Sequence, residues 1–303
     1  MTVALPPPVP GTGFDLETET AGRVRMYRDG PDEGRPILLV HSVNAAGSAY
    51  EVRPIYTHFA TSRPTYAIDL PGFGASDRSD RNYTPRLMTD AVHAACEEVR
   101  RRHEGAEVDL LGLSLASEFV ARKTHEHPDG VRTLALVSPT GFAGSGRKAQ
   151  PEGSTRAMPN FYRFVSWDRW DAKLYGLLVR PRVIRYFLEK TWGSKDIDEG
   201  LFDYDVLTTQ VEGAQHAPLR FVSGYLFSLD ISPIYESLKL PVWMVHGVRG
   251  DFVDYRGAKT LGHLSNWEIH AFETGALPHF EVPDDFFASY DRFLERADPP
   301  TPS

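Results

Sequence analysis

The sequence predicts an α/β fold with a mostly parallel central sheet flanked by helices. Short apolar runs of strand length alternate along the chain with longer segments that have helical spacing. Strands joined through helices make right-handed crossovers and form a parallel sheet. Loops rich in small and polar residues follow several of these strands. Ligands bind at the carboxyl ends of the strands in such sheets, so residues just after each strand are the candidates for chemistry.

Composition narrows the classes of protein that the chain can belong to. Its 303 residues, 41% of them hydrophobic, suit one large domain or a domain with an insertion. The formal charge of −8 argues against a nucleic-acid partner. Cys96 is the only cysteine, which excludes an intrachain disulfide and a cysteine metal cluster. The apolar runs are far shorter than the ~20 residues of a membrane span. Residues 1–10 lack the positive charge of a signal peptide, so we expect a cytoplasmic protein.

The first hundred residues predict three strands and two helices. Thr84 is a suitable N-cap for the second helix, because Pro85 then occupies the first helical position. The Pro/Gly-rich residues 71–77 predict a loop after the third strand. The predicted strands are residues 23–28, 37–40 and 65–70, and the predicted helices are residues 49–59 and 84–103.

The rest of the chain continues the alternation but is interrupted once. Gly, Ser, Lys and Gln dominate residues 143–154, which indicates a linker. The following residues, 156–232, are dense in aromatic side chains and predict helices without a buried strand. The predicted strands on either side are residues 108–113, 131–137, 240–245 and 267–272, and the predicted helices are residues 114–127 and 284–296.

Ser114 lies at the junction of a predicted strand and a predicted helix. Gly112 and Ala116 flank it two residues to either side. A sharp strand-to-helix turn needs small residues at these two places, because larger side chains would collide. This arrangement is typical of a nucleophile elbow, which presents a serine hydroxyl at a helix N-terminus. The alternative interpretation is an ordinary serine N-cap.

A serine nucleophile needs a histidine base and a carboxylate that orients it. The loop after residues 240–245 contains Asp251 and Asp254, and the loop after residues 267–272 contains His279. Loops at the same edge of a parallel sheet can bring these side chains together. The chain therefore supplies serine, aspartate and histidine in that order.

Five motifs in order make the chain resemble the α/β-hydrolase superfamily. They are the loop at His41, residues 69–77, the Ser114 elbow, the loop at Asp251 and residues 278–283. The resemblance implies that Ser114 is the nucleophile, Asp251 the orienting acid and His279 the base. It also implies that residues 146–232 form an inserted helical cap on a core of residues 1–145 and 233–303.

Two loops depart from the pattern of that superfamily. Ser42 replaces the glycine that usually follows the histidine of the oxyanion loop. We expect the oxyanion-hole amides at Val43 and Leu115, with Asn44 as a possible donor. The acid loop is one residue longer than usual, so Asp254 is an alternative to Asp251.

The leading hypothesis is a serine hydrolase that cleaves a carboxylic ester or lactone through an acyl-enzyme on Ser114. It implies a small, apolar acyl substrate and neither a metal nor an organic cofactor. The same triad could instead act on an amide, a thioester or a carbon–carbon bond. A ligand-binding or receptor-like module on a hydrolase scaffold is the alternative outside enzymes. The sequence does not predict the oligomeric state.

Overall fold

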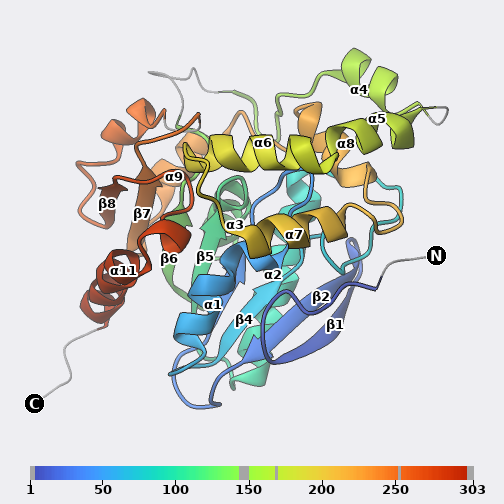
Figure 1. Ribbon diagram of the computed structural model, residues 1–303. Helices are drawn as coiled ribbons and strands as arrows, with labels where there is room; N and C mark the ends of the chain where they lie inside the picture. Colours follow the sequence, from blue (N-terminus) through green and yellow to red (C-terminus); the bar gives the residue numbers. More distant parts are fainter. Residues whose placement is uncertain (1–3, 143–149, 168–169, 252–253, 299–303) are drawn as a thin grey trace, which may run out of the picture.

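The computed structural model describes residues 4–142, 150–167, 170–251 and 254–298. An eight-stranded sheet in the order β1-β2-β4-β3-β5-β6-β7-β8 runs through the middle of the molecule (Figure 1). Strands β3 to β8 are parallel, whereas β1 pairs antiparallel with β2, and β2 with β4. The strands are β1 (Thr12–Thr18), β2 (Gly22–Asp29), β3 (Ile37–Val40), β4 (Thr65–Ile68), β5 (Val108–Leu113), β6 (Val131–Val137), β7 (Val242–Gly247) and β8 (Trp267–Phe272).

Helices cover both faces of the sheet, so its central strands are buried on both sides. Alternate residues of these strands belong to two separate apolar clusters. One cluster includes α2 (Pro85–Arg102), α3 (Ala116–Glu126) and α9 (Ile231–Ser237). The other includes the 3₁₀ helix η1 (Ala49–Val52), α1 (Arg53–Phe59) and α11 (Pro283–Ala297). This period of two is what continuous apolar strands produce when both faces are packed.

A group of helices lies between β6 and β7 in the chain and sits over one edge of the sheet (Figure 1). It contains α4 (Pro159–Val165), α5 (Asp171–Leu178), α6 (Pro181–Trp192), α7 (Glu199–Thr208), α8 (His216–Val222) and α9. Side chains of α6 and α7 join the apolar cluster beneath α1 and α11. The predicted boundary at residues 145/146 falls outside the described residues, and the division into core and cap stays a prediction.

Most predicted elements are present, with small differences at their ends. Strands β3, β5, β6 and β8 have the predicted bounds. Thr84 caps α2, and its hydroxyl accepts the backbone N–H of Leu87 at 3.1 Å. The sequence did not predict β1 or the short helix α10 (Pro278–Glu281). Strand β1 is half exposed at the sheet edge and therefore lacks the apolar run on which the other predictions rest.

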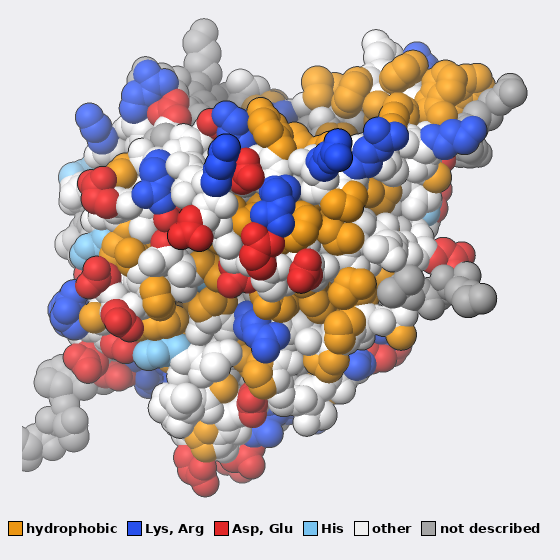
Figure 2. All heavy atoms as spheres, viewed as in Figure 1, with side chains coloured by type: hydrophobic (Ala, Val, Ile, Leu, Met, Phe, Trp, Pro, Cys, Tyr) orange, Lys and Arg blue, Asp and Glu red, His pale blue; other side chains and the backbone are white. Residues whose placement is uncertain are grey.

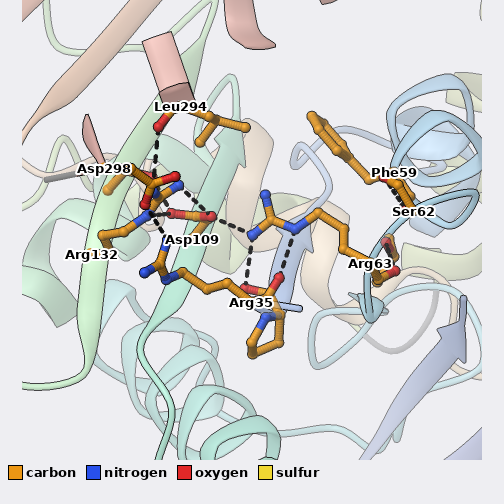
Figure 3. A network of polar contacts seen from close by, with 11 residues as sticks. Arg35, Phe59, Ser62, Arg63, Asp109, Arg132, Leu294 and Asp298 are labelled. Carbon is orange, nitrogen blue, oxygen red and sulfur yellow. Dashed lines mark hydrogen bonds and ion pairs between the residues drawn. The ribbon is translucent and has the colours of Figure 1, made fainter. Parts of the chain in front are cut away.

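A buried ion network ties the amino-terminal ends of the strands together (Figure 3). Asp109 of β5 is fully buried and accepts hydrogen bonds from Nε and Nη2 of Arg132, at 2.7 and 2.9 Å. Arg63 also donates to Asp109. Arg35 and Arg132 both pair with Asp298, just after α11. The network lies at the amino-terminal ends of the strands, opposite the carboxyl ends where ligands are expected.

Exposed apolar side chains gather on the helical segment (Figure 2). Hydrophobic spheres cover the region of α4 and α5 in this view. The exposed large hydrophobic residues there are Met158, Phe161, Phe164, Trp167 and Leu177. A search of the described helices found none with the length and hydropathy required to cross a bilayer.

Candidate active-site cavity

A cavity of about 410 Å³ lies between the carboxyl ends of the strands and the helical segment. That volume is within the usual range for small-molecule sites. Ser114 and Leu115 contribute to its wall from the turn between β5 and α3. Apolar side chains from α5, α6, α7 and α8 complete much of the rest. They are Leu178, Ile184, Phe187, Leu188, Leu201, Phe221 and Val222.

Ser114 has the backbone conformation of a nucleophile elbow. Its φ of +53° is in the left-handed region, which is strained for a residue with a side chain. The turn is held by a hydrogen bond from the Ser114 N–H to the carbonyl of Val137, 2.8 Å. Leu115, not Ser114, is the N-cap of α3, so the alternative interpretation as an ordinary serine cap is wrong. Its left-handed turn directs Ser114 toward the cavity, whose wall includes it.

The residues predicted to supply the oxyanion hole both line this cavity. Among the described residues, the backbone N–H groups of Val43 and Leu115 donate no hydrogen bond. His41 is fully buried and holds the oxyanion loop: its Nδ1 donates to the Ser42 carbonyl, 2.6 Å, and its Nε2 accepts the Leu70 N–H, 2.9 Å. The predicted alternative donor, Asn44, uses its side-chain amide on Ser42 and Glu51.

His279, the predicted base, donates to a backbone carbonyl, and its role as the base stays a prediction. Its imidazole is fully buried, and Nε2 donates to the backbone carbonyl of Glu51 at 2.8 Å. Nδ1 has no hydrogen-bond partner within the described part of the chain. Burial without a carboxylate lowers the pKa of His279 to about 4. His279 lies in α10, is not among the residues that line the cavity, and shares no hydrogen bond with Ser114 within the described residues.

The two candidate acids are also away from the cavity. Asp251 is exposed, and its carboxylate pairs with Lys190 of α6 at 3.3 Å. Asp251 and Lys190 line a separate surface hollow beside Gly193. Asp254 pairs with Arg256 at 2.8 Å. The structure therefore brings Ser114, Val43 and Leu115 together, but it does not join either aspartate to His279.

Ala276 and Leu277 are the residues of the loop after β8 that line the cavity. The loop is fixed at this point, because the Ser138 hydroxyl donates to the Ala276 carbonyl at 2.7 Å and the Ala276 N–H donates to the carbonyl of Thr191 at 2.8 Å. This loop thus presents two apolar side chains to the cavity, whereas a base was expected. His279 stands three residues further along, within the motif of residues 278–283 that predicted it as the base.

Two carboxyl groups that were not predicted from the sequence line the cavity. Glu51 comes from η1 and Asp205 from α7, and both are almost completely buried. Their spacing in the sequence, 154 residues apart, gives no local signal for the pairing. Glu118, also buried, accepts a hydrogen bond from Thr140 in the cavity wall, and burial raises the pKa of the Glu118 carboxyl. A search of the described residues for three or more clustered metal ligands found none.

The comparisons with known proteins agree with this architecture. A model of the alpha/beta hydrolase family matches residues 37–289, which is most of the chain. The chain therefore belongs to the alpha/beta hydrolase family.

Individual relatives are distant. The chain is 24% identical to an abhydrolase domain-containing protein of Caenorhabditis elegans, over 86% of this chain and 57% of the relative. It is 26% identical to a 1-acylglycerol-3-phosphate O-acyltransferase of Arabidopsis thaliana, over 75% of this chain and 58% of the relative. A solved meta-cleavage product hydrolase of Pseudomonas fluorescens has a TM-score of 0.70 and 17% identity, covering 94% of this chain and 98% of its own. The chain thus spans less than two thirds of these two curated relatives.

Proposed function

We propose that the protein binds a small, mainly apolar ligand with an acyl or ester carbonyl in the cavity at Ser114. The apolar wall from α5 to α8 would hold the chain of the ligand, since such pockets are mostly apolar with a few placed polar groups. The unpaired amides of Val43 and Leu115 would receive its carbonyl oxygen. The name of the Arabidopsis relative, an O-acyltransferase, is consistent with an acyl ligand.

The observation that supports a binding role is that residue 276 lines the cavity, whereas His279 does not. The residues of the loop after β8 that line the cavity are Ala276 and Leu277, and His279 donates its hydrogen bond to the Glu51 carbonyl. A serine hydroxyl without a base is a poor nucleophile. Binding without rapid turnover is therefore the function that this geometry favours.

Hydrolysis of a carboxylic ester or lactone is the second candidate. The left-handed φ of Ser114 and the two unpaired amides favour it, because these features serve acyl transfer. Action on an amide, thioester or carbon–carbon bond would use the same nucleophile. Each of these reactions needs His279 to leave the Glu51 carbonyl, or another base to replace it.

A fluorophosphonate probe and a panel of p-nitrophenyl esters distinguish the two functions. We compare the wild type with Ser114→Ala and with Ala276→His, which adds an imidazole to the cavity wall. If the protein is a binder, the wild type is not labelled and hydrolyses the esters no faster than Ser114→Ala. Ala276→His then gains labelling and turnover of at least about 10-fold, since a positioned base contributes ~10²–10⁴-fold.

Ala276→His with Ser114→Ala is the matched control and should lose that gain. Labelling of wild-type Ser114, together with ester turnover that disappears in Ser114→Ala, would replace the binding role by hydrolysis.

A further inference from the structure

Two acidic side chains from separate elements share the wall of the Ser114 cavity. Glu51 of η1 is 4% exposed, and Asp205 of α7 is 3% exposed. The loop before η1 is held to α7 beside them, because the Thr208 hydroxyl donates to the Ala46 carbonyl at 2.8 Å. The carboxyl pair is therefore a fixed feature of the cavity.

The two carboxyl groups differ in how their oxygens are satisfied. One oxygen of Glu51 accepts the Ser42 N–H at 2.7 Å, and the other accepts the side-chain amide of Asn44. In contrast, Oδ1 of Asp205 is buried and has no hydrogen-bond partner among the described residues. A buried polar atom without a partner is unfavourable, so a hydrogen-bond donor supplied by a ligand would be favourable.

Among the described residues that line the cavity, no cation compensates this pair, so a second negative charge beside Glu51 is disfavoured. Burial and the nearby charge of Glu51 raise the pKa of Asp205 well above its ordinary value. Within the described residues, the cavity wall contains no lysine, arginine or histidine side chain. The buried guanidinium of Arg78 donates to the carbonyls of Gly74 and Thr208 and is not part of this wall.

We propose that Asp205 and Glu51 recognise a hydrogen-bond-donating, cationic ammonium head group on the apolar ligand and exclude an anionic one. This inference deepens the proposed function and rests on it. An ammonium group would supply the missing hydrogen-bond donor for Oδ1 of Asp205 and, as an adjacent cation, would favour the ionised form of Asp205 beside Glu51. A carboxylate or phosphate in the same position would meet two acidic groups without a compensating cation, which is costly at a buried site.

Asp205 thus sets the selectivity among ligands of equal apolar length. A neutral hydroxyl can donate one hydrogen bond to Asp205 but brings no charge, so it ranks between the two ions. The Arabidopsis relative is named for 1-acylglycerol-3-phosphate, and the phosphate group of such a compound would be disfavoured in this cavity.

The test is a series of eight-carbon probes that differ only in the head group. Isothermal titration calorimetry at pH 7.5 compares octylamine, 1-octanol, octanoate and octyl phosphate on the full chain. We expect octylamine to bind at least about 10-fold more tightly than octanoate, with 1-octanol between them. Asp205→Asn should reduce the preference for octylamine at least about 3-fold, because the amide keeps the shape but loses the acid.

Asp203→Asn is the matched control, because Asp203 lies on the same helix but is exposed. It should leave all four affinities unchanged. Octanoate or octyl phosphate binding as tightly as octylamine would overturn the head-group inference while leaving the proposed function intact. Absence of binding by all four probes and also by methyl octanoate, which carries the ester carbonyl without a charge, would contradict both. The ranking in the wild type decides the matter even if Asp205→Asn fails to fold.

Discussion

At the scale of single residues, the decisive contrast is between Ser114 and His279. Ser114 could be predicted because its neighbours Gly112 and Ala116 define a local turn, which the positive φ of Ser114 reflects. The role of His279 depends on whether its imidazole faces the cavity, and a local sequence pattern does not determine this direction. The ring packs in α10 against the carbonyl of Glu51, 228 residues away in the chain. The cavity receives Ala276 instead.

The burial of His279 predicts a pH dependence of stability. Its pKa of about 4 in the folded protein is below the ~6.5 of an unfolded histidine, so the unfolded state binds a proton first as the pH falls. The stability contributed by the neutral ring is present above pH ~6.5 and decreases toward pH 4. We expect the free energy of unfolding to fall about 2 kcal/mol more between pH 8 and pH 5 in the wild type than in His279→Gln.

Urea unfolding at both pH values measures this difference. His263→Gln is the control, because His263 is exposed and should retain the wild-type pH dependence. An equal pH dependence in His279→Gln and in the wild type would contradict the buried, neutral assignment.

At the scale of elements, the junction of β5 and α3 is limited by close packing. A Cβ atom at Gly112 would lie 2.7 Å from Cγ2 of Val120 and 3.0 Å from the Ala116 backbone. The strand and the helix that follows it can approach this closely only because residue 112 has no side chain. The elbow geometry of Ser114 therefore follows from the contact between two elements as well as from its own φ.

Gly112→Ala should lower the free energy of unfolding by about 1–3 kcal/mol through overpacking. Gly176→Ala is the matched control, because Gly176 is exposed in α5 and a Cβ atom there would meet nothing within 4 Å. It should be neutral or stabilising by up to about 1 kcal/mol, since alanine favours helix. Denaturant titrations measure both, and equal stability of the two variants would contradict the packing argument.

At the scale of the whole molecule, the two ends of the parallel strands carry different features. The carboxyl ends of the strands carry the cavity, whereas the opposite edge carries the Asp109 network (Figure 3). That network joins β5, β6, the segment before β4 and the end of α11. Asp109 is the fully buried acid of the network, so its removal leaves Arg63 without an acidic partner and Arg132 with only the exposed carboxylate of Asp298.

Asp109→Asn should lower the free energy of unfolding by about 3–5 kcal/mol. Binding of 1-octanol, measured where the variant is still folded, should not change, because the network is at the other end of the strands. Asp129→Asn, an exposed residue before β6, is the control and should have wild-type stability. A loss below about 1 kcal/mol in Asp109→Asn would show that the network contributes little to stability.

The sequence by itself determined the alternation of strands and helices, most of their bounds and the serine turn. These features depend on residues close to one another in the chain: apolar periodicity, caps and small residues at tight turns. Only the tertiary structure decided which side chains share the cavity. Ala276 of the loop after β8 lines it, and so do Glu51 and Asp205, which are 154 residues apart in the chain. The physical reason is that the direction of a side chain depends on packing between elements that are distant in the chain, which a local pattern does not contain.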